Sequence, residues 1–183
     1  MALLAEEIVE EWLNRNGYFT IRGIKLGVHE IDILAIKLKG LEIEARHIEV
    51  QASSNPVSYL CQLSKRLRKE TGRSPQSTKP RSIKEIEESI DEWLDRKYHQ
   101  KRKNELRHSL YPGNWNYELV IHKVKYDEEI EIIKGKGIKI YYLSDVIKSI
   151  SKSKNTIIQC AAGSSLLELI NFTDSRGKLS SKV

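Results

Sequence analysis

Apolar residues recur at helical spacing at the start of the chain and at strand spacing soon after it. The four-residue steps from Leu4 through Ile8 to Trp12 predict an amphipathic helix over residues 3–14, which ends at an Asn-Gly pair. Strands are then predicted over residues 18–22, 30–39 and 46–52, with Gly40 turning the chain between the last two. The chain therefore opens with a helix followed by three strands.

The remainder reads as helices first and alternating strands and helices afterwards. The predicted helices cover residues 55–75, 83–108, 126–134, 146–150 and 164–172, and the predicted strands cover residues 116–125, 138–143 and 156–161. Ser82 and Glu85 form a capping-box pair at the start of the long helix, and Ser144 is expected to cap a later one. This order predicts an α/β sandwich built on a mixed sheet.

The length of 183 residues suits one domain. We expect residues 1–174 to form it, with a core from segments 1–60 and 114–174, a basic helical insertion over about 61–112, and a flexible tail at 175–183. No apolar run approaches the roughly 20 residues that a membrane span needs. With two widely separated cysteines and no signal peptide, the sequence is read as that of a cytoplasmic protein without membrane contact.

The stretch "RHIEVQAS" carries the most informative pattern in the third strand. Strand alternation puts Glu49 and Gln51 on one face and Ile48 and Val50 on the other. A carboxylate buried in such a strand is costly unless a partner compensates its charge. Asp32 lies within the preceding strand, so two carboxylates are expected to meet on neighbouring strands.

Two buried carboxylates repel each other unless a cation lies between them. A hard divalent ion, Mg²⁺ or Mn²⁺, takes oxygen ligands and often only one or two carboxylates from the protein. Such an ion activates water and stabilises charge on a phosphate under attack. Gln51 is placed to orient that water or a phosphate oxygen.

Glu6, the Gly17-Tyr18 turn, "EIDILAI" and "HIEVQAS" together resemble the PD-(D/E)xK nuclease superfamily. The nearest branches are the archaeal Holliday-junction resolvases and the Mrr-like restriction endonucleases, and the likeness covers about residues 1–60. The resemblance implies a restriction-endonuclease-like α/β/α sandwich with a central mixed sheet and a helical insertion. It also implies that Asp32, Glu49 and the Val50 carbonyl hold the metal, and that Glu6 shapes the site from its helix.

Two positions depart from the family pattern. Ile31 stands in place of the proline of the motif, which many members also lack. Gln51 stands in place of the motif lysine, and a neutral amide offers hydrogen bonds where lysine offers a full positive charge. Some restriction enzymes of the superfamily carry Glu-x-Gln and cleave, so the resemblance still implies a nuclease. A lysine from elsewhere in the chain is a second source of the charge, and Lys65 is the best-placed candidate on sequence grounds.

The excess positive charge of the chain is concentrated in its middle. Residues 61–110 hold 14 Lys and Arg against 8 Asp and Glu, whereas the rest of the chain is balanced at 17 of each. Such a segment attracts polyanions, with nucleic acid the commonest candidate, although a solvated helix face gives the same pattern. The residues expected to grip a phosphate backbone are Lys65, Arg66, Arg68 and Lys69.

Each candidate residue also has a structural interpretation. Asp32 can cap a turn or pair with Arg22, Glu49 and Gln51 can form the wet face of an edge strand, and Glu6 can face solvent. His29, His47 and His122 are expected to be structural or exposed, since no spacing typical of a zinc site is present.

The function expected is that of a metal-dependent endonuclease that hydrolyses DNA phosphodiester bonds, in defence or repair. A catalytically silent nucleic-acid-binding module of the same fold is the first alternative. A protein-interaction subunit that docks a partner through the apolar stripe of helix 83–108 is the second. The resemblance also leaves a homodimer open.

Overall fold

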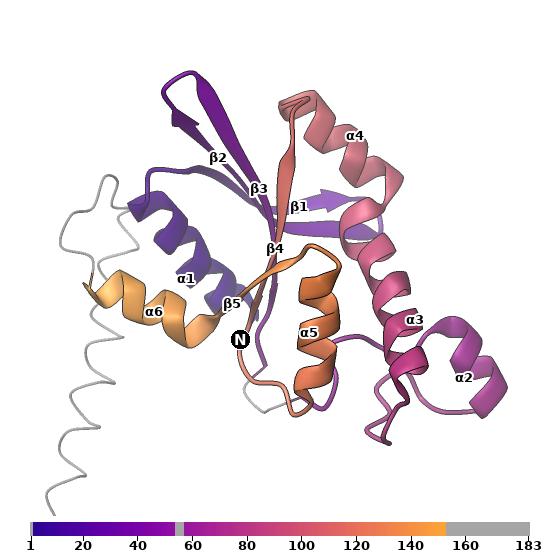
Figure 1. Cartoon of the computed structure of the whole chain (residues 1–183). Coiled ribbons are helices and arrows are strands. Elements are labelled where there is room, and N and C mark those ends of the chain that lie inside the picture. The colour runs from indigo at the N-terminus through magenta and orange to yellow at the C-terminus, as the bar shows by residue number, and fades with distance from the viewer. Residues whose placement is uncertain (1, 54–56, 153–183) are drawn as a thin grey trace, which may run out of the picture.

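The computed structural model describes residues 2–53 and 57–152 (Figure 1). The helices are α1 (Ala2–Arg15), α2 (Lys65–Thr71), α3 (Ile83–Leu94), the π-helix η1 (Asp95–His99), α4 (Lys101–Leu110), α5 (Asp127–Gly135) and α6 (Leu143–Lys152). The strands are β1 (Phe19–Leu26), β2 (His29–Lys39), β3 (Glu42–Gln51), β4 (Trp115–Ile121) and β5 (Lys139–Tyr142). None of the helices in these two ranges is long and apolar enough to cross a membrane.

The strands form one mixed sheet in the order β1-β2-β3-β4-β5. The strands β1, β2 and β3 pair antiparallel, and Gly40 turns the chain between β2 and β3 with φ of 63°. Strand β4 pairs parallel to β3, and β5 pairs parallel to β4, as connections through helices allow. The predicted α/β class with a mixed sheet is confirmed.

Helices cover both faces of the sheet (Figure 1). On one face Ile48 and Val50 of β3 pack in a core with α1 and α6. On the other face Leu119 and Ile121 of β4 pack in a second core with α3, η1 and α5. Because side chains alternate along a strand, the odd-numbered residues of β3 point into the second layer. Glu49 therefore faces the α3–η1–α4 side.

The helix predicted over residues 55–75 is much shorter in the structure. It spans only Lys65–Thr71, with the Ser64 hydroxyl accepting from the Leu67 N–H at its start. The preceding segment is not helical because the buried Glu129 carboxylate accepts the N–H groups of Leu60 and Cys61, at 2.6 and 2.8 Å. Helical spacing of leucines in this stretch therefore reflected core contacts and not a continuous helix.

The predicted long helix 83–108 is interrupted. Its capping box at Ser82 and Glu85 is confirmed, but α3 passes into η1 and then stops at Gln100, whose ψ of 134° is not helical. The apolar stripe of this run is buried against β4 and α5, so within the described residues it is not exposed to a partner.

Two smaller predictions also meet the structure. Helix α6 begins at Leu143, so Ser144 lies inside it and does not cap it. The strand and helix predicted at 156–161 and 164–172, and the tail at 175–183, lie outside the described residues.

Candidate functional site

Asp32 and Glu49 lie side by side on neighbouring strands. The antiparallel register pairs Ile33 with Ile48, so the residues next to them in sequence, Asp32 and Glu49, also face each other. The Val50 N–H donates to Oδ2 of Asp32 at 2.7 Å, which fixes that carboxylate against β3. The two carboxylates that the sequence analysis singled out are thus brought together by strand pairing.

Glu49 is almost completely buried and is surrounded by cationic and imidazole groups. The Lys97 ammonium lies 2.5 Å from Oε2, and the Lys103 ammonium lies 2.9 Å from Oε1. The His47 Nε2 lies 3.0 Å from the same Oε1. This network balances the charge whose burial in β3 would otherwise be costly.

The break between η1 and α4 is what brings both lysines to one carboxylate. In an unbroken helix, each residue is rotated by about 100° from the last, so residues six apart point about 120° away from each other and Lys97 and Lys103 would diverge. The turn at Gln100 redirects α4, and the Lys103 ammonium donates to the Lys97 carbonyl at 2.8 Å as well as to Glu49. Local π-helical geometry of this kind often occurs at functional sites.

The proton on His47 is fixed by its neighbours. Burial lowers the pKa of His47 to about 4, so the ring is neutral at physiological pH. The Arg107 guanidinium lies 2.7 Å from Nδ1 and, having only donors, makes that nitrogen the acceptor. The ring proton is therefore on Nε2 and is donated to Glu49.

The pKa values of the two carboxyl groups are shifted in opposite directions. Burial, reinforced by the charge of Glu49, raises the pKa of Asp32 to about 7. Burial opposes ionisation of Glu49 too, but the His47 hydrogen bond and the charges of Lys97 and Lys103 outweigh it and lower its pKa to about 2. A site with one carboxylate ionised and one poised near neutrality is typical of functional centres.

The other predicted site residues lie around this pair. Glu6 on α1 is partly buried, and burial raises its pKa, with Glu49 and Lys97 among the charges that act on it. Gln51 donates its side-chain amide to the Leu60 carbonyl at 2.7 Å. Val50 meets the site through its N–H, and its carbonyl as a metal ligand stays a prediction.

The structural interpretations of Asp32 and Glu49 do not hold. Arg22 does not pair with Asp32, since its guanidinium contacts Glu10 at 2.8 Å and Glu7 at 3.6 Å. Strand β3 is central in the sheet, and Glu49 is 1% exposed, so this is not the wet face of an edge strand.

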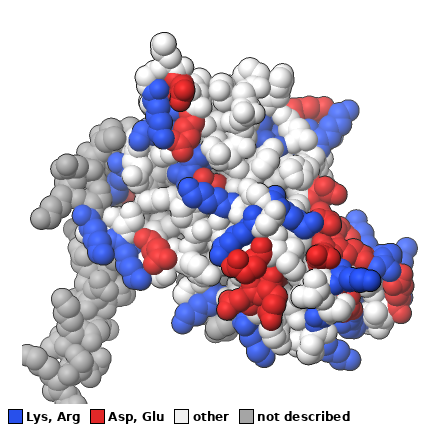
Figure 2. All heavy atoms as spheres, viewed as in Figure 1, with Lys and Arg blue, Asp and Glu red and all other residues white. Residues whose placement is uncertain are grey.

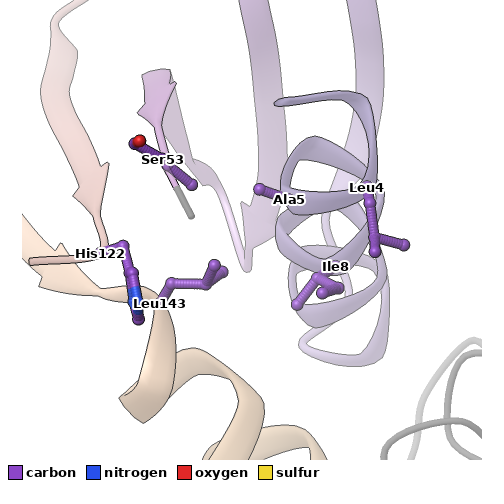
Figure 3. A pocket seen from close by; sticks show the side chains of 7 residues that line it. Leu4, Ala5, Ile8, Ser53, His122 and Leu143 are labelled. Atoms are coloured by element: carbon purple, nitrogen blue, oxygen red, sulfur yellow. The ribbon is translucent and has the colours of Figure 1, made fainter. Parts of the chain in front are cut away.

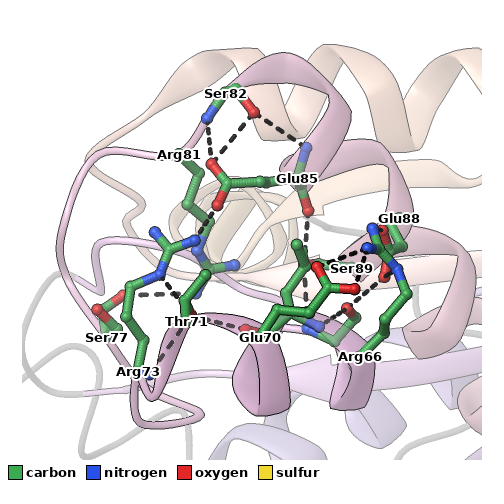
Figure 4. A network of polar contacts seen from close by, with 12 residues as sticks. Arg66, Glu70, Thr71, Arg73, Ser77, Arg81, Ser82, Glu85, Glu88 and Ser89 are labelled. Atoms are coloured by element: carbon green, nitrogen blue, oxygen red, sulfur yellow. Dashed lines mark hydrogen bonds and ion pairs between the residues drawn. The ribbon is translucent and has the colours of Figure 1, made fainter.

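The predicted phosphate-gripping residues all lie on α2. Arg66 is ion-paired with Glu70 on its own helix and with Glu88 on α3 (Figure 4), so its charge is largely compensated. Acidic and basic side chains lie intermixed over α2 and α3 on the face seen in Figure 2. Lys65 and Lys69 remain exposed. Their contact with nucleic acid stays a prediction.

The lysine nearest the carboxylates differs from the one suggested by the sequence. Lys65 lies at the start of α2, where its N–H donates to Glu92 on α3. Lys97 and Lys103 contact Glu49 instead. No sequence spacing marks these two lysines, because their approach depends on the break at Gln100. The sequence does indicate His47, because it lies two residues before Glu49 and therefore on the same face of the same strand.

The donor set suits one hard divalent cation with an incomplete protein shell. In the described part of the chain, no group of three or more His, Cys, Asp and Glu is arranged to hold a metal ion. Asp32 and Glu49 offer two carboxylates, as Mg²⁺ often uses, with water and substrate oxygens completing the shell. Lys97, whose side chain is 30% exposed, would have to move from Oε2 of Glu49 to admit the ion.

An apolar hollow of about 160 Å³ lies at the opposite layer, against α1 (Figure 3). Its walls include Leu4, Ala5, Ile8, Ser53, His122 and Leu143. None of the described residues that line it carries a carboxylate or an ammonium group, so these residues offer no counterpart to the chemistry at Glu49.

Comparisons with known proteins leave the family open. No family model and no curated protein matches the sequence. A crystal structure of a protein of unknown function, AF1548, aligns over 77% of this chain with 18% identity and a TM-score of 0.40. This chain spans 59% of the length of that one. A likeness this distant carries no functional argument.

Asp32→Asn is expected to stabilise the metal-free protein at alkaline pH. The ordinary pKa of 3.8 rises to about 7 on folding, so the contribution of this carboxyl to stability is full below about pH 4 and is lost as pH rises through 7. The neutral amide avoids that loss, and we expect a gain on the order of 2–4 kcal/mol above pH 8. Urea unfolding in a chelator at about pH 4 and pH 8 measures it; equal stability of both proteins at pH 8 would contradict the raised pKa.

Lys103→Met is expected to destabilise the fold. The Lys103 side chain is 2% exposed, and its removal leaves Glu49 buried with fewer compensating charges. Loss of one partner of a buried ion pair costs about 3 kcal/mol. Urea unfolding provides the measurement, and Lys101→Met, at a side chain 87% exposed, is the matched control with a change below about 0.5 kcal/mol. Similar stabilities of the two variants would show that Lys103 does not balance Glu49.

Proposed function

We propose that this protein is a metal-dependent endonuclease that hydrolyses phosphodiester bonds in DNA, as the resemblance to the PD-(D/E)xK superfamily implies. The observation that carries the proposal is the meeting of Asp32 and Glu49 on neighbouring strands with the Lys97 ammonium 2.5 Å from Glu49. This arrangement offers two carboxylates and one ammonium group, the three groups that the family pattern calls for. The ammonium group belongs to Lys97 of η1, whereas the family pattern has its lysine at the position of Gln51.

Each residue has a distinct task in the proposed site. Asp32 and Glu49 would hold a divalent ion, and the chemistry such an ion would supply is activation of water and stabilisation of charge on the phosphate. Lys97 provides a positive charge for the phosphate, since an ammonium close to developing negative charge lowers the barrier. Lys103 and His47 orient Glu49 and keep it ionised. Burial excludes bulk water from these groups, which strengthens their electrostatic effect.

The test is direct. Purified protein is incubated with supercoiled plasmid, branched DNA and single-stranded DNA in Mg²⁺ or Mn²⁺. Cleavage is expected with either ion and is expected to stop in a chelator. A protein that leaves all three substrates intact under both ions would contradict the proposal.

A second candidate is a nucleic-acid-binding module of the same fold that does not cleave. It is favoured by the engagement of both Glu49 oxygens with ammonium groups and by the Gln51 amide, which is bonded to Leu60. This candidate predicts DNA binding that weakens steeply with salt and does not respond to divalent ions beyond their ionic strength.

A further inference from the structure

A polar cavity of about 360 Å³ lies at the end of β3, beside the proposed site. Gln51 forms part of its wall and stands on the same strand face as Glu49, two residues away. The rest of the wall comes from residues 57–62, residues 75–78 and Arg81. A volume of this size falls within the range of about 300–1,000 Å³ typical of small-ligand sites.

Arg81 is the charged group of this cavity, and its side chain is built into the wall. The residue is only 9% exposed, and its guanidinium donates to the Cys61 carbonyl at 2.8 Å. It also donates to the Ser77 carbonyl at 3.4 Å (Figure 4). The guanidinium carbon lies 4.0 Å from the centre of the Tyr59 ring, which stacks in turn on Tyr126. The group is therefore held in one place.

Among the described residues, Arg81 lacks one hydrogen-bond partner and an ion-pair partner. Its Nε is buried without a hydrogen-bond partner among the described residues. Arg46 has the carboxylate of Glu118 as an ion-pair partner, whereas in residues 2–53 and 57–152 no carboxylate forms an ion pair with Arg81. Burial lowers the pKa of Arg81, and the more distant charge of Glu129 offsets only part of this.

Arg107 can be compared with Arg81, because it too is buried and has no carboxylate as an ion-pair partner in the part of the chain that the structure describes. Its guanidinium is bonded to His47, the Tyr98 carbonyl, Asn104 and Tyr117, and it leaves no buried nitrogen unsatisfied. Arg81 differs in having a buried nitrogen without a hydrogen-bond partner among the described residues, whereas a cavity adjoins each of the two arginines. An anion in the cavity beside Arg81 would balance the guanidinium charge that no carboxylate of the described residues balances.

We propose that this cavity is a phosphate-binding subsite that takes a phosphate group of the nucleic-acid strand next to the bond to be cut. Guanidinium groups suit phosphate oxygens, and hydroxyl and amide groups in the wall, such as those of Ser77, Thr78 and Gln62, add neutral hydrogen-bond donors. The identity of the ligand rests on the proposed function. The presence of an anion site rests on Arg81 alone.

The position of the cavity fits a nucleic-acid strand that runs from Glu49 along β3. Two strand residues span about 7 Å, the distance from Glu49 to Gln51 along β3. The part of the cavity wall formed by Gln51 therefore lies within reach of a nucleic-acid strand that contacts Glu49. The subsite would thereby fix the register of the strand in the site without reading its bases.

The experiment titrates inorganic phosphate into isotope-labelled full-length Asp32→Asn protein in a chelator and follows backbone amide shifts. We expect saturable shifts confined to residues 58–62 and 75–81. Thr78→Glu adds a carboxylate at an exposed position of the cavity wall and leaves the bonds of Arg81 untouched. It is expected to weaken phosphate binding at least tenfold, whereas the neutral control Thr78→Gln changes it less than about twofold.

Two outcomes would overturn the subsite. One is a titration without shifts in these residues, and the other is equal phosphate affinity of Thr78→Glu and Thr78→Gln. The measurement needs neither metal nor cleavage, so it fails or succeeds independently of nuclease activity. Oligonucleotides with a 5′-phosphate or a 5′-hydroxyl then identify the source. If the 5′-phosphate strengthens oligonucleotide binding and Thr78→Glu removes that gain, the cavity takes a terminal phosphate. If the two oligonucleotides bind equally well and Thr78→Glu weakens the binding of both, the cavity takes an internal phosphate.

Discussion

Asp32→Asn is expected to lower metal-dependent DNA cleavage by at least about 10³-fold, which corresponds to about 4 kcal/mol of barrier. The asparagine keeps an oxygen that can accept the Val50 N–H, so the local strand contact survives. What it removes is one of the two negative charges that the proposed cation needs. Initial rates on supercoiled plasmid in saturating Mn²⁺ provide the measurement.

The matched control for this variant is Asp145→Asn. Asp145 lies exposed on α6, where it pairs with Lys148, and its substitution makes the same chemical change far from the site. Its cleavage rate is expected to equal that of the parent protein. Because Asp32→Asn is expected to be more stable at alkaline pH, unfolding does not account for a lost activity. Retained cleavage by Asp32→Asn would remove Asp32 from the site.

Lys97→Met is expected to lower the cleavage rate by about 10²–10³-fold, as the loss of one electrostatic group at a reacting phosphate does. The same variant in combination with Gln51→Lys is expected to recover much of that loss. The double variant returns the positive charge to the position where the family motif carries it. Single-turnover rates of the parent, the two single variants and the double variant form a complete cycle.

Lys101→Met is the control for this series, because Lys101 is exposed two residues beyond η1 and its ammonium lies 3.8 Å from Glu105 on the same helix, with no ion pair to Glu49 among the described residues. Its rate is expected to stay within about twofold of the parent, as for a surface side chain. If Lys97→Met cleaves as fast as Lys101→Met, the cation at Glu49 has no role in the reaction. If the double variant shows no recovery, the charge at position 97 does not replace the motif lysine.

Much of the fold could be predicted because its central strands are strongly patterned. The apolar run around Asp32 and the alternation around Glu49 fix two neighbouring strands, and Gly40 fixes their antiparallel connection. These local signals were enough to predict that the two carboxylates meet. Strand pairing transmits a sequence pattern directly into side-chain proximity, which is why this part of the site was accessible.

The remainder of the site depends on tertiary structure. Lys97 and Lys103 reach Glu49 only because the helix changes geometry at η1 and stops at Gln100. No glycine or proline in this stretch indicates such a break in the sequence. The segment before α2 is non-helical because Glu129, 68 residues away from Cys61, accepts its N–H groups. Arg81 lies in a loop with other basic residues, and nothing in the sequence there predicts that its side chain is buried.

The central claim is that Asp32 and Glu49 hold one divalent cation between them. Crystals grown with Mn²⁺ and measured at a wavelength that excites manganese test it most directly. We predict one anomalous peak at about 2.1 Å from an oxygen of each carboxylate, with the Lys97 ammonium withdrawn from Glu49, and no peak in Asp32→Asn. A Mn²⁺-soaked parent crystal without that peak, with Lys97 still bonded to Glu49, would contradict the account.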